Sequence, residues 1–487
     1  MRRYIYRRME DSTPEFGAWR HRWAALKRKL NNLRTQSLSQ LEELFNELIP
    51  THLLSQADEG VNSRKRVFPI RVTFFGFLYQ ILKPQTSCRE AVRQIQALFA
   101  LQDRRKIDED DSAYCQARNR LPEENLDRIF KETANAADKR TQYRSWFGHP
   151  VKVVDASSTS MPDTPANQAL YPQSKAQAPG CGFPLMKLVV FMSLASGAIL
   201  DVVKGNKHNH ELSLFRRLCS SLKPGDLILG DDAYSDYATV AFLPTINCHG
   251  VFRSQGRRHK DFRRGQKLGP ADRLVTWKKP PQKAKTMTDT EWAALPAEIQ
   301  VRLIRVQIPI RGFRTRQIDI VTTLLDPKKY PADEIADLFR RRWRLELCFR
   351  DIKTSMGMEE MRCKSPEMVH KELLMYLIAH NLIRCLMAEA AAIHDTDLER
   401  ISFKGSVDTL RQYSAALAQA RNRKQRSRLL RELHEILASD RLPDRPNRTE
   451  PRAVKRRPKP YALLNQHRSR FKETPHRGRR RANSGRK

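Results

Sequence analysis

Three features that this 487-residue chain lacks limit the classes of protein to which it can belong. It has no run of about 18 apolar residues, so the sequence predicts no membrane-spanning helix. Its first residues, MRRYIYRRMED, lack the apolar stretch of a signal peptide. None of its eight cysteines forms a C-x-x-C pair, which disfavours a zinc ribbon or knuckle. Such scattered cysteines are typical of reduced thiols in a cytosolic protein.

Acidic residues are too few to balance the basic ones. The chain has 54 Asp and Glu against 90 Lys and Arg, a formal net charge of +36. Residues 451–487 hold 14 of those bases and one acid, so the rest of the chain carries +23 by itself. A surface this positive attracts polyanions, and counterion release favours nucleic acid. The composition therefore predicts nucleic-acid binding, to which the tail adds non-specific affinity.

Residues 1–145 are predicted to form a helical region. Apolar residues recur at spacings of three and four in LSQLEELFNELI, FFGFLYQIL and REAVRQIQALFAL. Short helices joined by tight turns are typical of helix-turn-helix DNA readers, although an ordinary helical bundle is the alternative. The segment AYCQARNRL offers side-chain types that bind base edges. We therefore predict DNA contacts from Gln116, Arg118 and Arg120.

The pattern changes after the helical region. Short apolar segments, VKVVDAS, LMKLVVFMSL and AILDVVKG, precede a helix, the strand DLILGDD, another helix and the strand NCHGVFRS. This is the order of an RNase H-like sheet, so we predict an α/β core over residues 146–253 and 318–395. A β-rich insertion, 254–317, interrupts it, and the segment IDIVTTLL fits either part. A helical C-terminal region, 396–440, and a basic tail, 441–487, predicted to be disordered, follow.

Three acids lie where a metal site on a sheet needs them. Asp155 ends the strand VKVVD, Asp231 ends LILGD, and Glu346 lies on a long helix predicted from about Pro331 to Met356. Hard oxygen ligands suit Mg²⁺ or Mn²⁺. Two such ions activate an attacking oxygen and stabilise a leaving one in phosphodiester cleavage. Each acid alone is more simply a turn or cap residue, so the prediction depends on their combination.

The predicted long helix places Glu346 between two cations. At about 100° per residue, Arg342, Glu346 and Lys353 fall in one narrow stripe beside an apolar stripe. A carboxylate flanked by Arg and Lys suits a site that binds both metal and phosphate. The alternative is an amphipathic helix with ordinary ion pairs between its turns.

At these positions the chain resembles a known family. FRRRWRLELCFRDIK is similar to the Y-x2-R-x3-E-x6-K signature of IS4-type bacterial insertion-sequence transposases of the DDE superfamily. The matching residues are Phe339, Arg342, Glu346 and Lys353. VVDAS and LGDDAY resemble the segments that bear the two family aspartates, and SCREAV and AYCQARNRLP resemble its helical region. Phe339 replaces the signature tyrosine and lacks the hydroxyl that would bind a phosphate.

The resemblance implies a metal-dependent DNA transposase. Asp155, Asp231 and Glu346 would bind two Mg²⁺ or Mn²⁺ ions, and Arg342 and Lys353 would hold DNA phosphates. Phe339 joins these DNA contacts through its place in the signature. The expected partners are double-stranded DNA, as transposon terminal inverted repeats and as target, and a second copy of the chain in a synaptic homodimer.

The expected reaction is hydrolysis at the transposon end followed by attack of the freed 3′-OH on target DNA, with a hairpin intermediate as one route of excision. The resemblance places the protein in the bacterial cytoplasm with the nucleoid. Two alternatives stay open at this point. One is a DNA-binding regulator with an inactive catalytic domain, and the other is a different RNase H-like nuclease.

Two residue assignments also stay open. Asp232 adjoins Asp231, and neighbours on a strand point to opposite faces. The resemblance favours Asp231. In the insertion, Trp277 and then Trp292 are candidates to stack on a base turned out of the DNA. Packing within a small β unit is the simpler explanation for Trp277.

Overall fold

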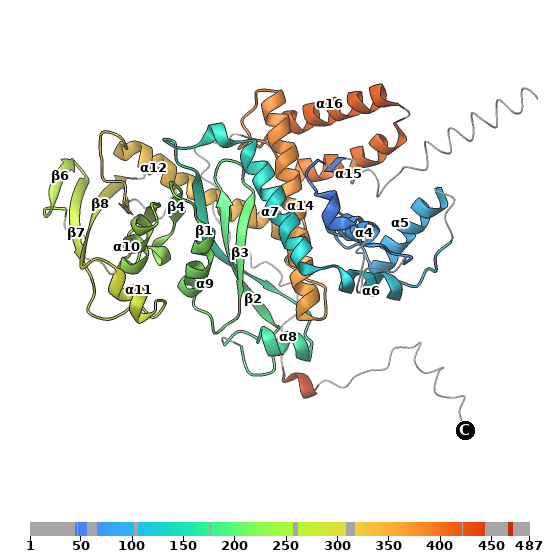
Figure 1. Cartoon of the computed structure of the whole chain (residues 1–487), viewed down its shortest axis with the longest axis horizontal. Helices are drawn as coiled ribbons and strands as arrows, with labels where there is room; N and C mark the ends of the chain where they lie inside the picture. Colours follow the sequence, from blue (N-terminus) through green and yellow to red (C-terminus); the bar gives the residue numbers. More distant parts are fainter. Residues whose placement is uncertain are drawn as a thin grey trace, which may run out of the picture.

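The computed structural model describes residues 44–45, 47–55, 66–101, 106–175, 177–256, 262–307, 317–420, 422–443 and 466–470. Over these residues the chain is a mixed α/β protein built around a large sheet (Figure 1). The predictions for residues 1–43 and for nearly all of the basic tail lie outside the described residues.

The described strands form one sheet in the order β3-β2-β1-β4-β5-β9-β8-β7-β6. The strands are β1 (Val151–Ser160), β2 (Leu185–Ser193), β3 (Ile199–Gly205), β4 (Leu227–Gly230), β5 (His249–Arg253), β6 (Gln266–Gly269), β7 (Asp272–Lys278), β8 (Glu298–Gln307) and β9 (Gln317–Thr322). β1, β2 and β3 pair antiparallel, whereas β4 and β5 run parallel to β1. The succession of strands and helices predicted for 146–253 is present, with one unexpected short helix, α8 (Pro165–Leu170), between β1 and β2.

The first part of the segment IDIVTTLL forms β9, and the pairing of β9 shows where this segment belongs. It pairs antiparallel with β5 of the first part and with β8 of the predicted insertion. The insertion therefore extends the same sheet, and β6, β7 and β8 lie at one end of the molecule (Figure 1). One helix of the insertion, α11 (Asp289–Ala294), begins with a capping box at Thr288.

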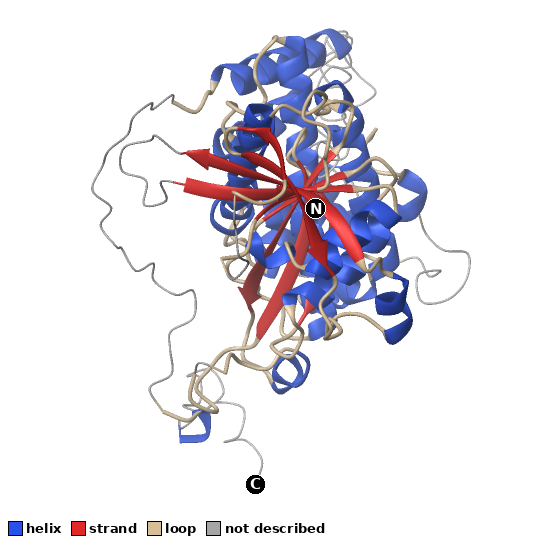
Figure 2. Ribbon diagram, turned by 90° about the vertical axis from the view of Figure 1, so that its left-hand side faces the viewer, coloured by secondary structure: helices blue, strands red, loops and turns tan. Residues whose placement is uncertain are grey.

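Helices cover both faces of the sheet, whose strands fan out with a twist (Figure 2). The helices are α4 (Ile70–Leu82), α5 (Cys88–Leu101), α6 (Ser112–Arg120), α7 (Glu123–Lys139), α9 (Glu211–Leu218), α10 (Tyr237–Thr245), α12 (Ala332–Arg340), α13 (Arg344–Arg350), α14 (Pro366–Ile393), α15 (Phe403–Gln419) and α16 (Arg423–Ser439). Val153 belongs to the core that contains α7, α13 and α14, and its neighbour Val154 to the core that contains α9 and α10. This alternation along β1 decides which face of the sheet each following side chain meets.

Within the described part of the N-terminal region, α4, α5, α6 and α7 lie between residues 70 and 139, whereas residues 47–49, at the end of the predicted helix LSQLEELFNELI, form a turn. α4, α5 and α6 lie beyond α7 and α14, at the end of the molecule opposite β6–β8 (Figure 1). The Ser87 hydroxyl accepts from the Glu90 amide at 3.1 Å, so it caps α5 as its position before the helix predicts.

α14 is the central helix of the fold. By length and composition it is apolar enough to cross a membrane, but 94% of its apolar window is buried inside the protein. Asn381 fixes its register against the sheet, because its side chain exchanges two 2.9 Å hydrogen bonds with the backbone of Ile199 in β3. Burial among the other elements thus explains the apolar character of this helix.

A buried ion pair joins the far end of the sheet to α12. The guanidinium of Arg302 in β8 is 1% exposed and binds both oxygens of Asp272 in β7, with Nη2 2.6 Å from Oδ2. Its Nη1 donates to the carbonyl of Tyr330, just before α12, at 2.6 Å. A buried charge of this kind stabilises only while its partner is present.

We predict that Asp272→Asn lowers the free energy of unfolding by about 3–5 kcal/mol, because it leaves a buried guanidinium without a carboxylate. Chemical denaturation followed by fluorescence measures the change. Glu298→Gln is the matched control, since the Lys278–Glu298 pair joins the same two strands at 3.8 Å but is exposed. The control should cost less than about 1 kcal/mol. Equal losses in the two variants would contradict the role given to burial.

Candidate active site

The register of the sheet sets two predicted acids side by side. β1 and β4 are parallel neighbours in which Val151 pairs with Leu227 and Val153 with Leu229. Counting two residues further at the same offset brings Asp155, in the middle of β1, level with Asp231, the residue that follows β4. β1 continues to Ser160, so the prediction that Asp155 ends its strand is corrected. Neighbouring strands lie about 4.8 Å apart, so the two residues lie side by side where β4 ends.

Glu346 reaches this edge from α13, which lies on the same face of the sheet as Val153 and hence Asp155. Arg342 connects the acids, since its Nη1 lies 3.8 Å from Asp155 Oδ2 and its Nη2 lies 3.4 Å from Glu346 Oε1. Within the described residues, the oxygens of the three acids are not all within 4.8 Å of one another. Arg342 thus bridges Asp155 and Glu346, and its charge also acts on Asp231.

Burial and a neighbouring carboxylate raise the pKa of each aspartate, the neighbour being Asp231 for Asp155 and Asp232 for Asp231. Burial is the largest cause for Asp155 and, with the charge of Asp231, brings its pKa to about 6, although Arg342 opposes the shift. Burial also raises the pKa of Asp231, while Arg342 and Arg253 lower it. A site that crowds carboxylates in this way gains stability when cations enter it.

Two charged neighbours of the triad were missed by the sequence analysis. Arg253, the last residue of β5, acts on Asp231 from the strand beside β4. Glu211, the first residue of α9, acts on Asp155 and raises its pKa further. Arg253 ends a predicted strand as Asp155 and Asp231 do, and that position was a signal that could have found it.

Asp231 and Asp232 occupy different positions in the local structure, since Asp231 precedes a 3₁₀ turn and Asp232 is its first residue. Asp231 is the N-cap of a 3₁₀ turn, Asp232–Tyr234, and its Oδ1 accepts from the Ala233 amide at 2.9 Å. The pKa of Asp231 responds to Arg342, which also approaches Asp155. This position agrees with the choice of Asp231 over Asp232.

The helix predicted from Pro331 to Met356 is helical throughout 332–355 but does not wind uniformly. A 3₁₀ turn, Arg341–Trp343, separates α12 from α13, and a π-helical turn, Asp351–Ser355, follows α13. Residues three apart in a 3₁₀ turn lie on one side. The prediction of one uniform α-helix at about 100° per residue is therefore corrected at Arg341–Trp343 and at Asp351–Ser355.

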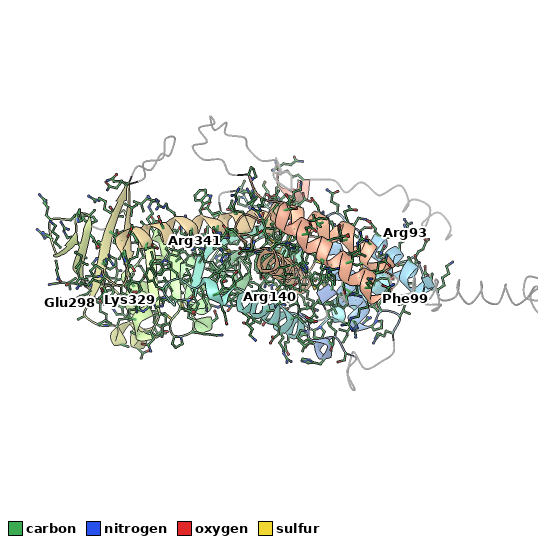
Figure 3. The ribbon with its side chains drawn as sticks, turned by 90° about the horizontal axis from the view of Figure 1, so that it is seen from above. Arg93, Phe99, Arg140, Glu298, Lys329 and Arg341 are labelled. Carbon is green, nitrogen blue, oxygen red and sulfur yellow. The ribbon has the colours of Figure 1, made fainter. Side chains whose placement is uncertain are left out.

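The 3₁₀ turn lets two arginines reach one carboxylate. Arg341 and Arg344 each donate to Glu399 Oε1 at 2.5 Å, and Arg144 lies 3.3 Å from the same oxygen. Figure 3 shows Arg341 between the far end of the sheet, marked by Glu298, and the helical end, marked by Arg93. Burial lowers the pKa of Arg344 to about 10, and Glu399 opposes that shift. Glu399 thus fixes the segment that carries Arg342 and Glu346.

Lys353 lies in the π-helical turn and contacts β1 beyond Asp155. Its Nζ donates to the Ser158 carbonyl at 2.7 Å, and burial lowers its pKa. Phe339 is 7% exposed and packs in the core, with the Arg342 guanidinium 6.0 Å from its ring. The placement of Phe339 among the DNA contacts is therefore corrected, because a ring in this position supports Arg342 from the interior.

The residues proposed to read DNA from α6 divide into two groups. Gln116 is exposed and Arg120 is half-buried. Arg118 is 7% exposed and donates to the thiols of Cys88 and Cys363. The prediction that Arg118 reads bases is corrected, since its guanidinium is held inside the protein.

The tryptophans of the insertion are both half-buried. Trp277 in β7 packs against two apolar clusters, one with α9 and α10 and one with Tyr237. Trp292 in α11 makes an edge-to-face contact with Tyr237, and Lys279 Nζ lies 5.1 Å from its ring centre. The packing explanation offered for Trp277 agrees with these contacts.

The residues described above lie within regions that are similar to known proteins. The family model for the transposase DDE domain matches residues 146–382. The transposase InsG for insertion sequence element IS4 of Escherichia coli (strain K12) is 28% identical over 437 residues, which cover 89% of this chain and 95% of that protein. The chain belongs to the IS4-type DDE transposases. The match to the DDE domain begins just before β1 and ends within α14, so it contains Asp155, Asp231 and Glu346.

Further relatives of this DDE transposase match shorter stretches. The putative transposase y4zB of Sinorhizobium fredii (strain NBRC 101917 / NGR234) is 32% identical over 82 residues, 16% of this chain and 23% of that protein. A cryo-EM structure of the piggyBac transposase synaptic complex with hairpin DNA has a TM-score of 0.41 and 8% identity, covering 86% of this chain and 85% of that one. A likeness of this size assigns no role to any residue.

We predict that Asp155→Asn stabilises the metal-free transposase at pH 8. Because the pKa of Asp155 rises from 3.8 to about 6, its ionised form is disfavoured in the folded state, and the resulting loss of stability builds up between pH 3.8 and 6 and is complete above pH 6. Between these pH values folding is coupled to uptake of a proton, so the advantage of asparagine should fall to about half at pH 5 and vanish below about pH 3.8. Chemical denaturation with a chelator present, at both pH values, measures this difference.

Glu291→Gln is a control of opposite sign. Hydrogen bonds from the Thr288 amide and hydroxyl lower the pKa of Glu291, so losing its charge should reduce stability at pH 8. A stability loss in Asp155→Asn at pH 8 would show that Arg342 outweighs burial.

We predict that Glu399→Gln slows DNA strand cleavage by roughly 10- to 100-fold while the protein stays folded, since small displacements of a reacting group have effects of this size. The substitution removes the charge that holds Arg341 and Arg344. Single-turnover cleavage rates and circular dichroism measure activity and folding. Glu432→Gln is the control, because the Arg428–Glu432 pair at 2.8 Å in α16 is more exposed and contacts neither of these arginines. Unchanged cleavage in Glu399→Gln would remove the positioning role.

Proposed function

We propose that this transposase cuts the ends of its own transposon and joins the freed 3′-OH to target DNA. The observation that supports this most directly is the meeting of Asp155, Asp231 and Glu346 at one sheet edge around Arg342. The order β3-β2-β1-β4-β5, with β1 to β3 antiparallel and β4 and β5 parallel to β1, agrees with an RNase H-like core. We assign that core to residues 146–253 and 318–395, with 254–317 as the insertion.

DDE transposases use divalent metal ions. The oxygen-only donors Asp155, Asp231 and Glu346 fit Mg²⁺ or Mn²⁺, and the burial that raises the Asp155 pKa is what a cation would offset. We propose that these three residues hold two such ions. When bound, the ions supply activation of the attacking oxygen and charge stabilisation of the leaving oxygen.

Two cations beside the triad are suited to hold DNA phosphates. Arg342 is 16% exposed and touches two of the acids, and Lys353 lies along β1. A guanidinium fork binds phosphate oxygens in pairs, whereas an ammonium binds as a point charge. We propose that Arg342 orients the phosphate next to the cut and that Lys353 holds a phosphate further along the strand.

We propose that the helical region up to residue 145 binds transposon ends, with Gln116 and Arg120 as the remaining candidates for contact in α6. The net charge of +23 before the tail and the basic tail itself favour long DNA. Synapsis of two ends calls for a homodimer, and a hairpin intermediate is one route of excision, with nicking as the other. The protein would work in the bacterial cytoplasm on nucleoid DNA.

We predict that Asp155→Asn, Asp231→Asn and Glu346→Gln each reduce cleavage of a terminal-repeat duplex in Mg²⁺ by at least about 10²-fold. Each substitution removes one charged donor and keeps the side-chain shape. Asp232→Asn is the control, since it changes the adjacent carboxylate and should retain most activity. The assay resolves nicked, hairpin and joined products on denaturing gels.

The same assay separates the alternatives. Loss of cleavage in Asp232→Asn with activity retained in Asp231→Asn would exchange the two assignments. Metal-independent binding without any cleavage would indicate a regulator. Cutting with no preference for the terminal repeat would indicate a nuclease of another kind.

A further inference from the structure

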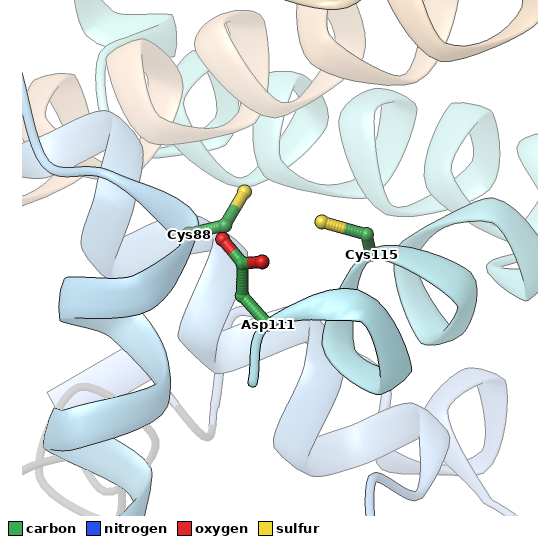
Figure 4. Close-up of side chains that lie close together, drawn as sticks. All are labelled: Cys88, Asp111 and Cys115. Carbon is green, nitrogen blue, oxygen red and sulfur yellow. The ribbon is translucent and has the colours of Figure 1, made fainter. Parts of the chain in front are cut away.

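Two cysteines and an aspartate meet in the helical region, away from the triad. Cys88 is the first residue of α5, Cys115 lies in the first turn of α6, and Asp111 is the N-cap of α6 (Figure 4). The two sulfurs and a carboxylate oxygen all lie within 4.8 Å of one another, and each residue is half-buried. Among the described residues, no other group of three metal-ligand side chains meets this limit.

The carboxylate of Asp111 does not cap the helix at whose start it lies. An aspartate at an N-cap normally accepts from an amide of the first turn. Asp111 makes no such capping bond, although it stands at the start of α6. Its oxygen lies with the sulfurs of Cys88 and Cys115 instead.

The spacing of the three donors suits zinc. Zn²⁺ binds thiolate sulfur at about 2.3 Å and carboxylate oxygen at about 2.0–2.2 Å in a tetrahedron, which sets donors about 3.5–4 Å apart. The three donor atoms, all within 4.8 Å of one another, are close to this spacing. Thiolate ligands also select zinc over magnesium, so this group differs in kind from the oxygen-only triad.

Two side chains outside the proposed ligand set donate hydrogen bonds to the Cys88 sulfur. Arg118 Nη1 donates to it at 3.0 Å and Gln80 Nε2 approaches it at 3.8 Å. Tyr114 fixes Gln80 through a 2.8 Å hydrogen bond, and the Arg118 guanidinium lies 3.9 Å from the ring centre of Phe77. Donors of this kind orient a metal-bound thiolate and stabilise its charge.

We propose that Cys88, Cys115 and Asp111 form a zinc site, with water as the fourth ligand. The ion ties the first turn of α5 to the first turn of α6. It thereby sets the orientation of α6, including the exposed Gln116 next to Cys115. The site is independent of the triad and stands whether or not Asp155, Asp231 and Glu346 act as proposed.

The test uses the full chain, freed of transition metals and kept reduced, in excess Mg²⁺ so that oxygen-only sites are filled. Titration with Co²⁺ should give a thiolate-to-cobalt charge-transfer band that saturates at one ion per chain and disappears when Zn²⁺ is added. Elemental analysis after dialysis should find one zinc per chain. Absence of the band would overturn the proposal.

Variants locate the ion. Cys88→Ser and Cys115→Ser should each remove most of the band, and Asp111→Asn should weaken Zn²⁺ binding by at least about tenfold. Asp111→Asn also protects the test against misfolding, because it removes no capping bond. Cys181→Ser is the control, since Cys181 is also half-buried but lies between α8 and β2. A band that survives in both serine variants, or a Cys88–Cys115 disulfide detected by mass spectrometry in the zinc-saturated protein, would refute the site.

Discussion

The parallel pairing of β1 with β4 is the constraint on which the candidate active site depends. It brings Asp155 and Asp231 close enough, on a partly buried surface, for the charge of Asp231 to raise the pKa of Asp155. That arrangement is unfavourable unless positive charge is brought to it. Arg342 comes from the helical segment on one face, and Arg253 from the neighbouring strand. The sheet thus supplies the anionic centre, and the surrounding elements supply its compensation.

The third acid depends on a contact far from the sheet edge. Glu346 lies two residues after Arg344, and Arg344 and Arg341 both bind Glu399. Arg144, a few residues after α7, binds the same carboxylate. One side chain therefore connects the region before β1, the segment 341–346 and the region after α14. Because these groups are largely removed from water, their attraction is stronger than that of an exposed pair. Losing the carboxylate would leave Arg341 and Arg344 without this ion-pair partner, whereas Arg144 would keep Asp397.

The sequence was most informative where function depends on local order. Predicted strand ends and the spacing along the late helix selected Asp155, Glu346 and Arg342, which the fold brings together, although β1 continues beyond Asp155 to Ser160. Burial was harder to infer from residue type. Arg118 was read as a DNA contact from its chemistry, yet Tyr114, Ala117 and Arg118 are spaced as one helix face and are all buried. The 3₁₀ turn at 341–343 had no local signal, because it accompanies contacts with Glu399, 55 residues beyond Arg344. Likewise, the spacing of cysteines excluded a zinc ribbon but was silent on two thiols that separate helices bring together.

The charge at the active site differs in sign from the charge of the chain. Three carboxylates against Arg342 and Lys353 leave the immediate site with a formal charge of −1, within a protein of +36. The wider surface attracts DNA at long range, while the metal-free centre repels the phosphate that must enter it. On the proposed assignment, two divalent ions would reverse the sign of the centre. Before the ions bind, electrostatics favours DNA that lies along the basic surface and outside the site. After they bind, it also favours entry of the scissile phosphate. Metal occupancy would therefore control the position of that phosphate more than the overall affinity for DNA.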